Sequence, residues 1–410
     1  MILYVTFDGL LQPLGRSQVL RYIEKLVERG WKFGVLSLER PADLADSARV
    51  ASVADHLESL GVEWLCLRYR PGGPREHLQN FTDAALAALD FAASRDLVMT
   101  HARSYHGAVV ALLLKAVLDV PYLFDMRGYW VDERRDSGRW FGNPALHRLA
   151  RVVERELYRR STGIVSLARP AAEDIRGGRF GAWEGPLAVI PTCVDPDEFV
   201  SETPRPDCVP RAVAQALHNR LVVGFVGSIN ESYRVREGFE LFRGVLSEDR
   251  EACLLCLTQQ VEMTNAMLDE VGIPSSARLV TSVPHEEISA WLTMIDWGLL
   301  LLNEPFAKRA SMPTKLGEFF ATGVRPVVYG CNEEVREWAQ ASGTGLVLDD
   351  TQPPSLRAAA RTIAASGKSD RSAVDLRRAR ELTMRHFSLH SGVDRYDAMY
   401  REVLATRRTA

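Results

Sequence analysis

Residues 311 to 323 read Ser-Met-Pro-Thr-Lys-Leu-Gly-Glu-Phe-Phe-Ala-Thr-Gly, and residues 324 to 328 read Val-Arg-Pro-Val-Val. This stretch predicts a turn, a helix from Thr314 to Thr322, a glycine stop and a buried strand. The apolar run at residues 296–302 is typical of a parallel strand covered on both faces. A helix that begins beyond such a strand offers free N–H groups to an anion. Lys315 and Glu318 therefore suit a phosphate and a sugar hydroxyl, although an ordinary strand–helix unit with solvated side chains would also fit.

The composition is that of a globular chain with room for two domains. The 410 residues exceed one ordinary core, and 46% apolar and 25% charged residues are typical of soluble proteins. The net charge of -3 argues against a general nucleic-acid binder. Residues 1–7 carry no basic region, so we expect a first strand and no signal peptide. Apolar runs such as Gly107–Leu118, which contains Lys115, are too short to span a bilayer.

The six cysteines are scattered along the chain. Cys253 and Cys256 have C-x-x-C spacing, but they fall within a predicted strand, where positions three apart point to opposite faces. We therefore expect neither a redox pair nor a zinc site. A reduced, cytoplasmic protein is the expectation.

Strand and helix patterns alternate through both halves of the chain, which indicates parallel sheets wound on both faces. The first half predicts strands at Ile2–Phe7, Trp31–Leu38, Val62–Arg68, Leu97–His101, Tyr122–Asp125 and Gly163–Leu167, and helices at Ser17–Arg29, Leu44–Leu60, Glu76–Ala93, Tyr105–Leu118 and Pro144–Arg160. The second half predicts strands at Leu221–Val226, Ala252–Thr258, Arg278–Ser282, Trp297–Leu302, Pro326–Tyr329 and Leu346–Leu348, and helices at Tyr233–Leu246, Val261–Val271, His285–Met294, Thr314–Thr322, Asn332–Ala341 and Ser355–Ala365. Pro191–Pro210, with five prolines, predicts a linker.

These patterns predict an α/β protein of two Rossmann-like, doubly wound domains that face each other across one crevice. The predicted domains are residues 1–195 and residues 196–388. An amphipathic repeat in Val393–Leu404 predicts that a terminal helix, residues 389–410, packs back onto the first domain.

Two candidate ligand loops follow strands of the first half. Asp8–Ser17 carries Gly15 just before a helix, so it is a phosphate-loop candidate with a plain loop as the alternative. The segment 101–107 gathers His101, Arg103 and His106 at a strand end, where side chains reach the predicted crevice.

A third candidate, Asp125–Asp136, holds four carboxylates, three arginines and two aromatics in twelve residues. Such a concentration after a buried strand favours an acceptor or sugar platform over a solvated, salt-bridged loop.

The second half supplies basic residues around the opening stretch. The strand at Gly224–Val226 ends in Gly227 and Ser228, and the cations placed to surround a diphosphate are Arg234, Arg236, Lys308, Arg309 and Lys315. Cations around a leaving phosphate would stabilise its developing charge, although each alone is an ordinary surface charge.

Two other features point elsewhere. The helix Pro144–Arg160 carries five arginines beside apolar positions, so it suits an anionic membrane surface as well as ordinary surface packing. Asp195 and Asp197 match a D-x-D metal motif by letter, but they lie in the proline-rich crossing, and we interpret them as structural.

Taken in order, the motifs resemble the family 4 glycosyltransferases of the GT-B fold over nearly the whole chain. In the second half the resemblance rests on residues 189–199, 225–228, 283–288 and 296–298, and on Ser311–Glu318 with Gly323 and residues 326–328. In the first half, residues 15–19 and 125–133 resemble a bacterial branch of that family.

The resemblance implies a hexosyltransferase (EC 2.4 class) of polysaccharide biosynthesis that transfers a sugar from a nucleotide sugar such as a UDP-sugar, with retention and without a metal or other cofactor. The implied acceptor is a saccharide, a lipid-linked carrier or a small molecule, and the implied location is cytoplasmic, with peripheral contact at the inner face of the membrane left open. The implied site residues are Arg103, His101 and Asp132 for catalysis, Gly15, Arg234, Lys308, Thr314 and Lys315 for the donor diphosphate, Glu318 for the ribose, Val283 and His285 for the base, and Arg127, Trp130 and Glu133 for the acceptor.

The chain departs from the family pattern at Ala310, where the family's first glutamate, which usually holds the donor sugar, is expected. This departure keeps open a non-catalytic GT-B protein that binds a nucleotide or a partner. A sugar epimerase of the same fold fits the N-terminal motifs less well. Glu39 at a strand end would suit a NAD-dependent oxidoreductase, but the glycine triple of that fingerprint is missing.

Overall fold

The computed structural model describes the whole chain except residues 139–142, 200–207, 304–305, 331, 369–372 and 410. The described chain divides into two compact units, Met1–Pro191 with Leu389–Ala410, and Thr192–Ser388. Each unit is built on one sheet of parallel strands, which confirms the α/β class. The sequence put the first boundary at 195, and the units part four residues earlier, at Pro191.

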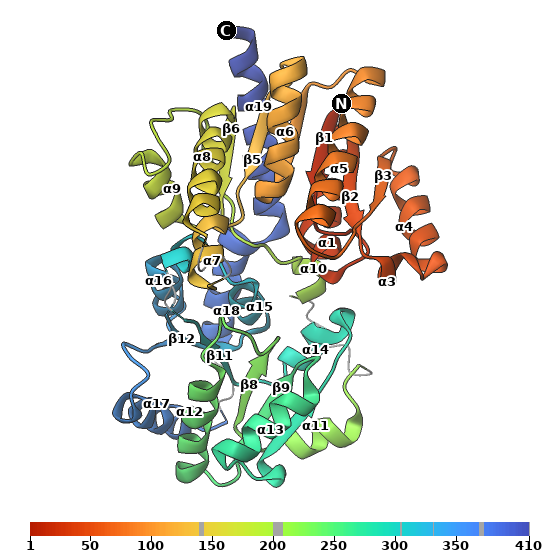
Figure 1. Cartoon of the computed structure of the whole chain (residues 1–410). Helices are drawn as coiled ribbons and strands as arrows, with labels where there is room; N and C mark the ends of the chain where they lie inside the picture. The colour runs from red at the N-terminus through yellow and green to blue at the C-terminus, as the bar shows by residue number, and fades with distance from the viewer. Residues whose placement is uncertain (139–142, 200–207, 304–305, 331, 369–372, 410) are drawn as a thin grey trace. The chain divides into compact units, whose positions relative to one another are not determined.

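Unit 1 has a seven-stranded parallel sheet in the order β3-β2-β1-β4-β5-β6-β7. Its strands are β1 (Ile2–Thr6), β2 (Phe33–Glu39), β3 (Glu63–Arg68), β4 (Met99–Arg103), β5 (Tyr122–Asp125), β6 (Gly163–Ser166) and β7 (Leu187–Val189). Its helices are α1 (Pro13–Gly15), α2 (Arg21–Glu28), α3 (Pro41–Leu44), α4 (Ser47–Ser59), α5 (Pro74–Ser94), α6 (Ser104–Leu118), α7 (Trp130–Asp136), α8 (Pro144–Arg160), α9 (Arg169–Arg176) and α19 (Leu389–Thr409). The last helix, α19, contacts α2, β5, β6 and β7 of this unit, and Figure 1 shows it in blue beside β5.

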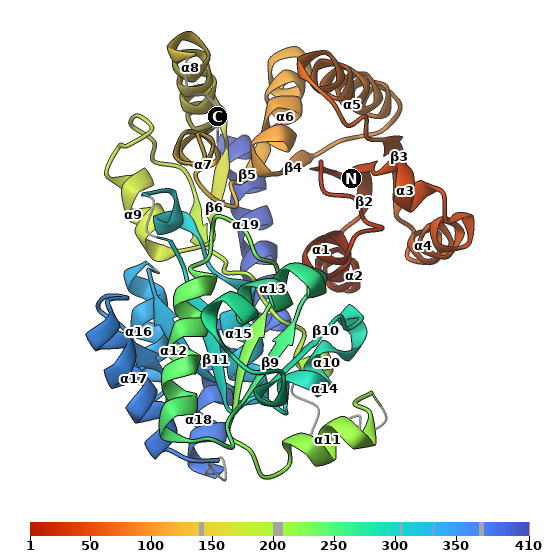
Figure 2. The same ribbon diagram turned by 60° about the horizontal axis from the view of Figure 1, so that its bottom comes forward.

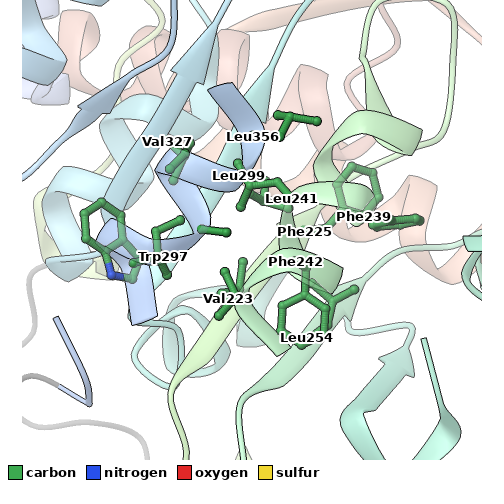
Figure 3. Packing of buried hydrophobic residues seen from close by; sticks show 14 of the residues in the cluster. Val223, Phe225, Phe239, Leu241, Phe242, Leu254, Trp297, Leu299, Val327 and Leu356 are labelled. Carbon is green, nitrogen blue, oxygen red and sulfur yellow. The ribbon is translucent and has the colours of Figure 1, made fainter. Parts of the chain in front are cut away.

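Unit 2 has a six-stranded parallel sheet in the order β10-β9-β8-β11-β12-β13. Its strands are β8 (Val222–Val226), β9 (Cys253–Leu257), β10 (Arg278–Thr281), β11 (Trp297–Leu301), β12 (Arg325–Tyr329) and β13 (Leu346–Val347). Its helices are α10 (Pro196–Phe199), α11 (Arg211–Leu217), α12 (Val235–Glu248), α13 (Val261–Val271), α14 (Ile288–Leu292), α15 (Thr314–Thr322), α16 (Glu333–Ala341), α17 (Pro353–Ala365) and α18 (Ala373–Leu382). Figure 3 shows part of the buried cluster on one face of this sheet, which includes Phe239 and Phe242 of α12 and Val223, Trp297 and Leu299 of the strands.

Helix α15 has the bounds that the sequence predicts, because its signals are local. Pro313 precedes it in an extended conformation (φ -66°, ψ 124°), and Gly323 ends it with φ 73°, a conformation that glycine adopts without strain. The N–H of Val324 then donates to the carbonyl oxygen of Phe319 at 2.8 Å, which closes the last turn.

Several predicted elements were wrong in detail. Residues 44–60 are not one helix, because the Asp46 side chain accepts from the N–H of Arg49 at 3.0 Å and starts α4 separately from α3. The segment 285–294 begins as a 3-10 turn, His285–Glu287, before α14. Residues 130–136, for which the sequence predicted no helix, form α7, and α9 and β7 were missed.

Candidate functional site

Unit 2 gathers basic groups where β8 and β11 end and α15 begins. The N–H of Arg234 donates to the carbonyl oxygen of Leu301 at 2.9 Å, and the N–H of Asn303 donates to that of Ser232 at 3.0 Å. These bonds tie the loop after β8 to the end of β11. The loop therefore lies beside the N-terminus of α15, whose first N–H groups have no partner within the helix.

Lys315 is the central cation of this region. Its ammonium nitrogen lies 3.1 Å from the Tyr233 hydroxyl and 4.2 Å from the centre of that ring. It also lies over Gly227, where φ is 117° and an added Cβ would collide with the ammonium. Glycine at this strand end therefore leaves room for the Lys315 ammonium. We use the name anion cradle for the first turn of α15 together with Gly227, Tyr233, Arg234 and Lys315.

Arg234 adds a second charge to the anion cradle. Its Nη1 donates to the Thr351 hydroxyl at 3.1 Å and lies 3.4 Å from a Glu237 carboxylate oxygen, and the guanidinium stacks 5.1 Å from the Tyr329 ring centre. Its Nε is buried and has no hydrogen-bond partner within the described chain. The two cations and the helix N-terminus favour an anionic ligand here.

Two of the other predicted cations are engaged elsewhere. Arg236 pairs with Glu270 on the surface of α12 and α13, and Arg309 lies 3.2 Å from the carboxylate of Glu333. Lys308 is partly exposed in the 3-10 turn Phe306–Ala310. Only part of the predicted basic group therefore meets at the cradle.

The residues predicted for the nucleoside lie along and beside α15. Glu318 is 8% exposed in the middle of the helix, and Thr314 is partly exposed at its first position. Val283 is buried, and the side chain of His285 lies outside the described residues. Ala310 is fully buried, so this position contributes an apolar contact where the family pattern has a carboxylate.

Unit 1 holds a buried polar cluster at the carboxyl ends of β1, β4 and β5. The Arg103 Nε donates to the Asp8 carboxylate at 3.0 Å, and its Nη1 lies 3.6 Å from Asp125. His101 lies 3.7 Å from the same Asp125 carboxylate. Because His101 and Arg103 are 1% and 3% exposed while Asp8 is 42% exposed, solvent reaches this cluster mainly at Asp8.

The C-terminal helix α19 completes this cluster. The Tyr400 hydroxyl lies 2.6 Å from Nδ1 of His101, and the Tyr396 hydroxyl donates to Asp125 at 3.1 Å. Sequence reasoning missed both tyrosines as functional candidates, although the amphipathic repeat of the terminal helix already placed them on its packing face. They hold His101 and Asp125 in position.

Charge in the cluster is set by these neighbours. Burial opposes ionisation of Asp125, but Arg127, His101 and Arg103 more than offset it and lower its pKa to about 2. Burial lowers the pKa of His101 and favours the neutral ring. Burial also opposes the charge of Arg103, but Tyr4, Asp8 and Asp125 raise its pKa above the ordinary value. The cluster therefore keeps a permanent cation beside two carboxylates.

Asp132 serves a different network. Its carboxylate is fully buried, pairs with Arg151 and lies 3.1 Å from Arg179 and 3.3 Å from Arg135. Burial opposes its ionisation, but the arginines lower its pKa. Three cations enclose this carboxylate, so its environment is that of a structural ion cluster, and we assign it no catalytic role.

Gly15 and Glu39 also have roles within the fold. An added Cβ at Gly15 would collide with the carbonyl oxygen of Gly9, so close packing within the loop requires this glycine. The Glu39 carboxylate is fully buried and accepts from the N–H groups of Leu10 and Leu11 at 2.7 and 3.1 Å. Glu39 anchors the loop after β1 and is closed to a ribose, which removes the feature that suggested an oxidoreductase.

Of the predicted acceptor residues, Arg127 lies on the turn between β5 and α7, and Trp130 and Glu133 lie in the first turn of α7. Arg127 adopts φ 59°, which is uncommon outside glycine, and lies 3.7 Å from Asp125. Trp130 is partly buried, with the Arg134 guanidinium 5.1 Å from its ring centre, and the Glu133 carboxylate packs against Gly128. The turn therefore connects the buried cluster around Asp125 to the start of α7 at Trp130.

No three His, Cys, Asp or Glu side chains of the described residues converge to hold a metal ion. Cys253 and Cys256 are buried in β9 with free thiols. None of the helices in the described part of the chain is long and apolar enough to cross a bilayer.

Comparison with known proteins agrees with the fold. Residues 15–193 match the family model of a glycosyl transferase 4-like domain. No curated protein matches the sequence. The chain is similar in structure to a sucrose-phosphate synthase from Thermosynechococcus elongatus (TM-score 0.73, 15% identity, 99% of both chains covered).

Two further solved structures have the same fold. The HepE protein of Anabaena in complex with UDP and glucose gives a TM-score of 0.68 at 12% identity, with 98% of this chain and 99% of that chain covered. WaaG, a glycosyltransferase involved in lipopolysaccharide biosynthesis, gives 0.65 at 13% identity, with 97% and 99% covered.

Proposed function

We propose that the chain is a retaining, metal-independent glycosyltransferase, because it has the GT-B fold and residues 15–193 match the model of a glycosyl transferase 4-like domain. Its donor is a nucleoside diphosphate sugar, and a UDP-hexose is the first candidate because HepE is complexed with UDP and glucose. The protein works in the cytoplasm, with α8 available for contact with a membrane surface.

The observation that carries this proposal is the anion cradle of unit 2. Lys315 and Arg234 flank the N-terminus of α15, so the donor diphosphate binds between two cations and the helix dipole. When the glycosidic bond to the diphosphate breaks, negative charge grows on the leaving oxygen, and these groups stabilise it. The leaving diphosphate can then accept the proton of the acceptor hydroxyl on the same face of the sugar, which retains the anomeric configuration.

In unit 1, we assign Asp8 to the acceptor. Arg103 fixes the Asp8 carboxylate at 3.0 Å, and the 42% exposure of Asp8 leaves it open to accept a hydrogen bond from an acceptor hydroxyl. Arg103, with His101 and Asp125 behind it, is thus a positioning residue. Arg127 on the turn after β5, and Trp130 and Glu133 in the first turn of α7, belong to the same acceptor side.

Titration of the full chain with UDP and GDP by calorimetry tests the donor side. We expect one of them to bind with a free energy that depends on salt, because the cradle is cationic. Donor hydrolysis or transfer by the purified protein then tests the reaction. Absence of binding by every nucleoside diphosphate would remove the basis of the proposal.

Glu318→Ala tests the ribose role. A carboxylate that accepts from ribose hydroxyls contributes about 1.5–3 kcal/mol, so the variant should bind the nucleotide at least tenfold more weakly. Glu334→Ala is the matched control, because Glu334 is also 8% exposed but lies on α16. Equal affinities of the two variants would contradict the assignment.

A further inference from the structure

A cavity of about 560 Å³ lies within unit 1 among α5, α6, α7 and α8. Figure 2 shows α5, α6 and α8 along one side of this unit. Most of its wall is apolar or aromatic, and the wall includes Phe81, Val109, Trp130, Leu146, Leu149 and Val153. Its volume falls within the range of about 300–1,000 Å³ that is typical of small-molecule sites.

Two polar side chains of the cavity interior, Glu154 and His106, are already matched within the protein or uncharged. The Glu154 carboxylate accepts from the Tyr105 hydroxyl at 3.1 Å and from Arg151 at 2.6 Å. The His106 ring stacks on Phe81 at 5.6 Å between centroids, and burial, together with Arg134, lowers its pKa to about 4, so the ring is neutral at pH 7. Since these groups have partners or no charge, the interior suits an apolar ligand.

The apolar wall continues onto the surface of α8. Leu146, Leu149 and Val153 line the cavity and yet are 42%, 60% and 36% exposed, and Val152 beside them is 56% exposed. Contiguous exposed apolar side chains mark a binding surface, because covering them with an apolar partner is favourable. A compact sugar would leave these side chains uncovered, whereas a long chain that leaves the cavity along α8 would cover them.

Arginine side chains lie beside the apolar wall and its continuation on the surface of α8. Arg134 lies at the cavity wall over Trp130, and Arg148 is exposed on α8 next to Leu149. A ligand that joins an aliphatic chain to a phosphate would match both features, with its chain against Leu149 and Val153 and its phosphate near Arg134.

We propose that this cavity binds the aliphatic chain of the acceptor, a lipid in which a phosphate joins the chain to the saccharide whose hydroxyl receives the sugar. The role as acceptor rests on the proposed glycosyl transfer, whereas binding of the chain rests on the cavity alone. A prenyl chain and an alkyl chain share the required chemistry, and the test separates them.

The test is calorimetric titration of the full chain with farnesyl phosphate, dodecyl phosphate and inorganic phosphate, each below the concentration at which it aggregates. At least one chain phosphate should bind tenfold or more tightly than inorganic phosphate, and the better of the two identifies the chain type. Ala150→Phe, which fills the cavity from α8, should weaken that binding at least tenfold. Val109→Phe fills it from α6 and replaces the first variant if thermal unfolding shows that Ala150→Phe does not fold.

Ala145→Phe is the matched control, because Ala145 is exposed on the same helix and does not line the cavity. It should change the affinity less than twofold. Chain phosphates that bind no better than inorganic phosphate, or equal losses in the lining and control variants, would overturn the inference. Titration with UDP on the same proteins separates the two proposals. UDP binding without chain binding overturns this inference and leaves the proposed function standing. Chain binding without UDP binding removes the basis of the proposed function, and with it the acceptor role, but leaves the chain-binding cavity standing.

Discussion

Replacement of Lys315 by Met tests the anion cradle most directly. The substitution keeps the length and the apolar stem of the side chain but removes the ammonium that lies 3.1 Å from the Tyr233 hydroxyl and over Gly227. A hydrogen bond to a charged group contributes about 1.5–3 kcal/mol. Taking about 2 kcal/mol for one ammonium–phosphate contact, the Kd of UDP should rise about 30-fold.

The assay is calorimetric titration of UDP into wild type and Lys315→Met at low and at high salt. The difference between the two proteins should shrink as salt rises, because Lys315 is partly exposed and its charge is screened. Arg236→Met is the matched control, since Arg236 pairs with Glu270 on the surface of the same unit. A Kd within twofold of wild type for Lys315→Met, or an equal loss for Arg236→Met, would refute the assignment of the diphosphate to this cradle.

Three further predictions concern unit 1, each checked by urea unfolding of the full chain. Glu39→Gln should lower the free energy of unfolding by about 3 kcal/mol, because the amide turns a donor toward a backbone N–H, and unchanged stability would show that the carboxylate does not hold the loop. Tyr400→Phe should lower the free energy of unfolding by about 1–3 kcal/mol, because Nδ1 of buried His101 loses the hydroxyl that lies 2.6 Å away. A loss smaller than the error of the unfolding measurement would contradict that contact. His106 has a folded pKa of about 4, below its unfolded value of about 6.5, so the stability from its neutral form is complete above pH 6.5 and is lost, by up to about 3 kcal/mol, as the pH falls to 4. His106→Leu should flatten that decline, and an equally steep decline in this variant would contradict the assignment to His106.

Local signals explain why so much of the fold was predictable. The α15 helix begins after Pro313 and ends at Gly323, and both residues act through their own backbone angles. Strand β11 was predicted from a run of apolar residues that the sheet buries on both faces. Elements whose bounds depend on a side-chain cap, such as α4 after Asp46, were predicted less well.

The cradle was predictable in part for the same reason. Lys315 and Glu318 follow from their place on α15, because the helix period sets which turn they occupy. The neighbours of Lys315 were not predictable, since Tyr233 lies 82 residues away and reaches it only through the sheet order. Likewise, the surface pairing of Arg236 with Glu270 depends on how α12 and α13 pack.

The sequence by itself determined the alternation of strands and helices, the bounds of α15 and the charged loops at strand ends, because these depend on periodicity, glycine and proline. Only the tertiary structure decided what each charged group does. Asp132 meets Arg151 and Arg179, Glu39 meets the loop after β1, and His101 meets Tyr400 at a sequence separation of 299 residues. The same residue types can bind a ligand or support the fold. Which role a side chain takes depends on its burial and on the partners that folding brings within hydrogen-bonding distance.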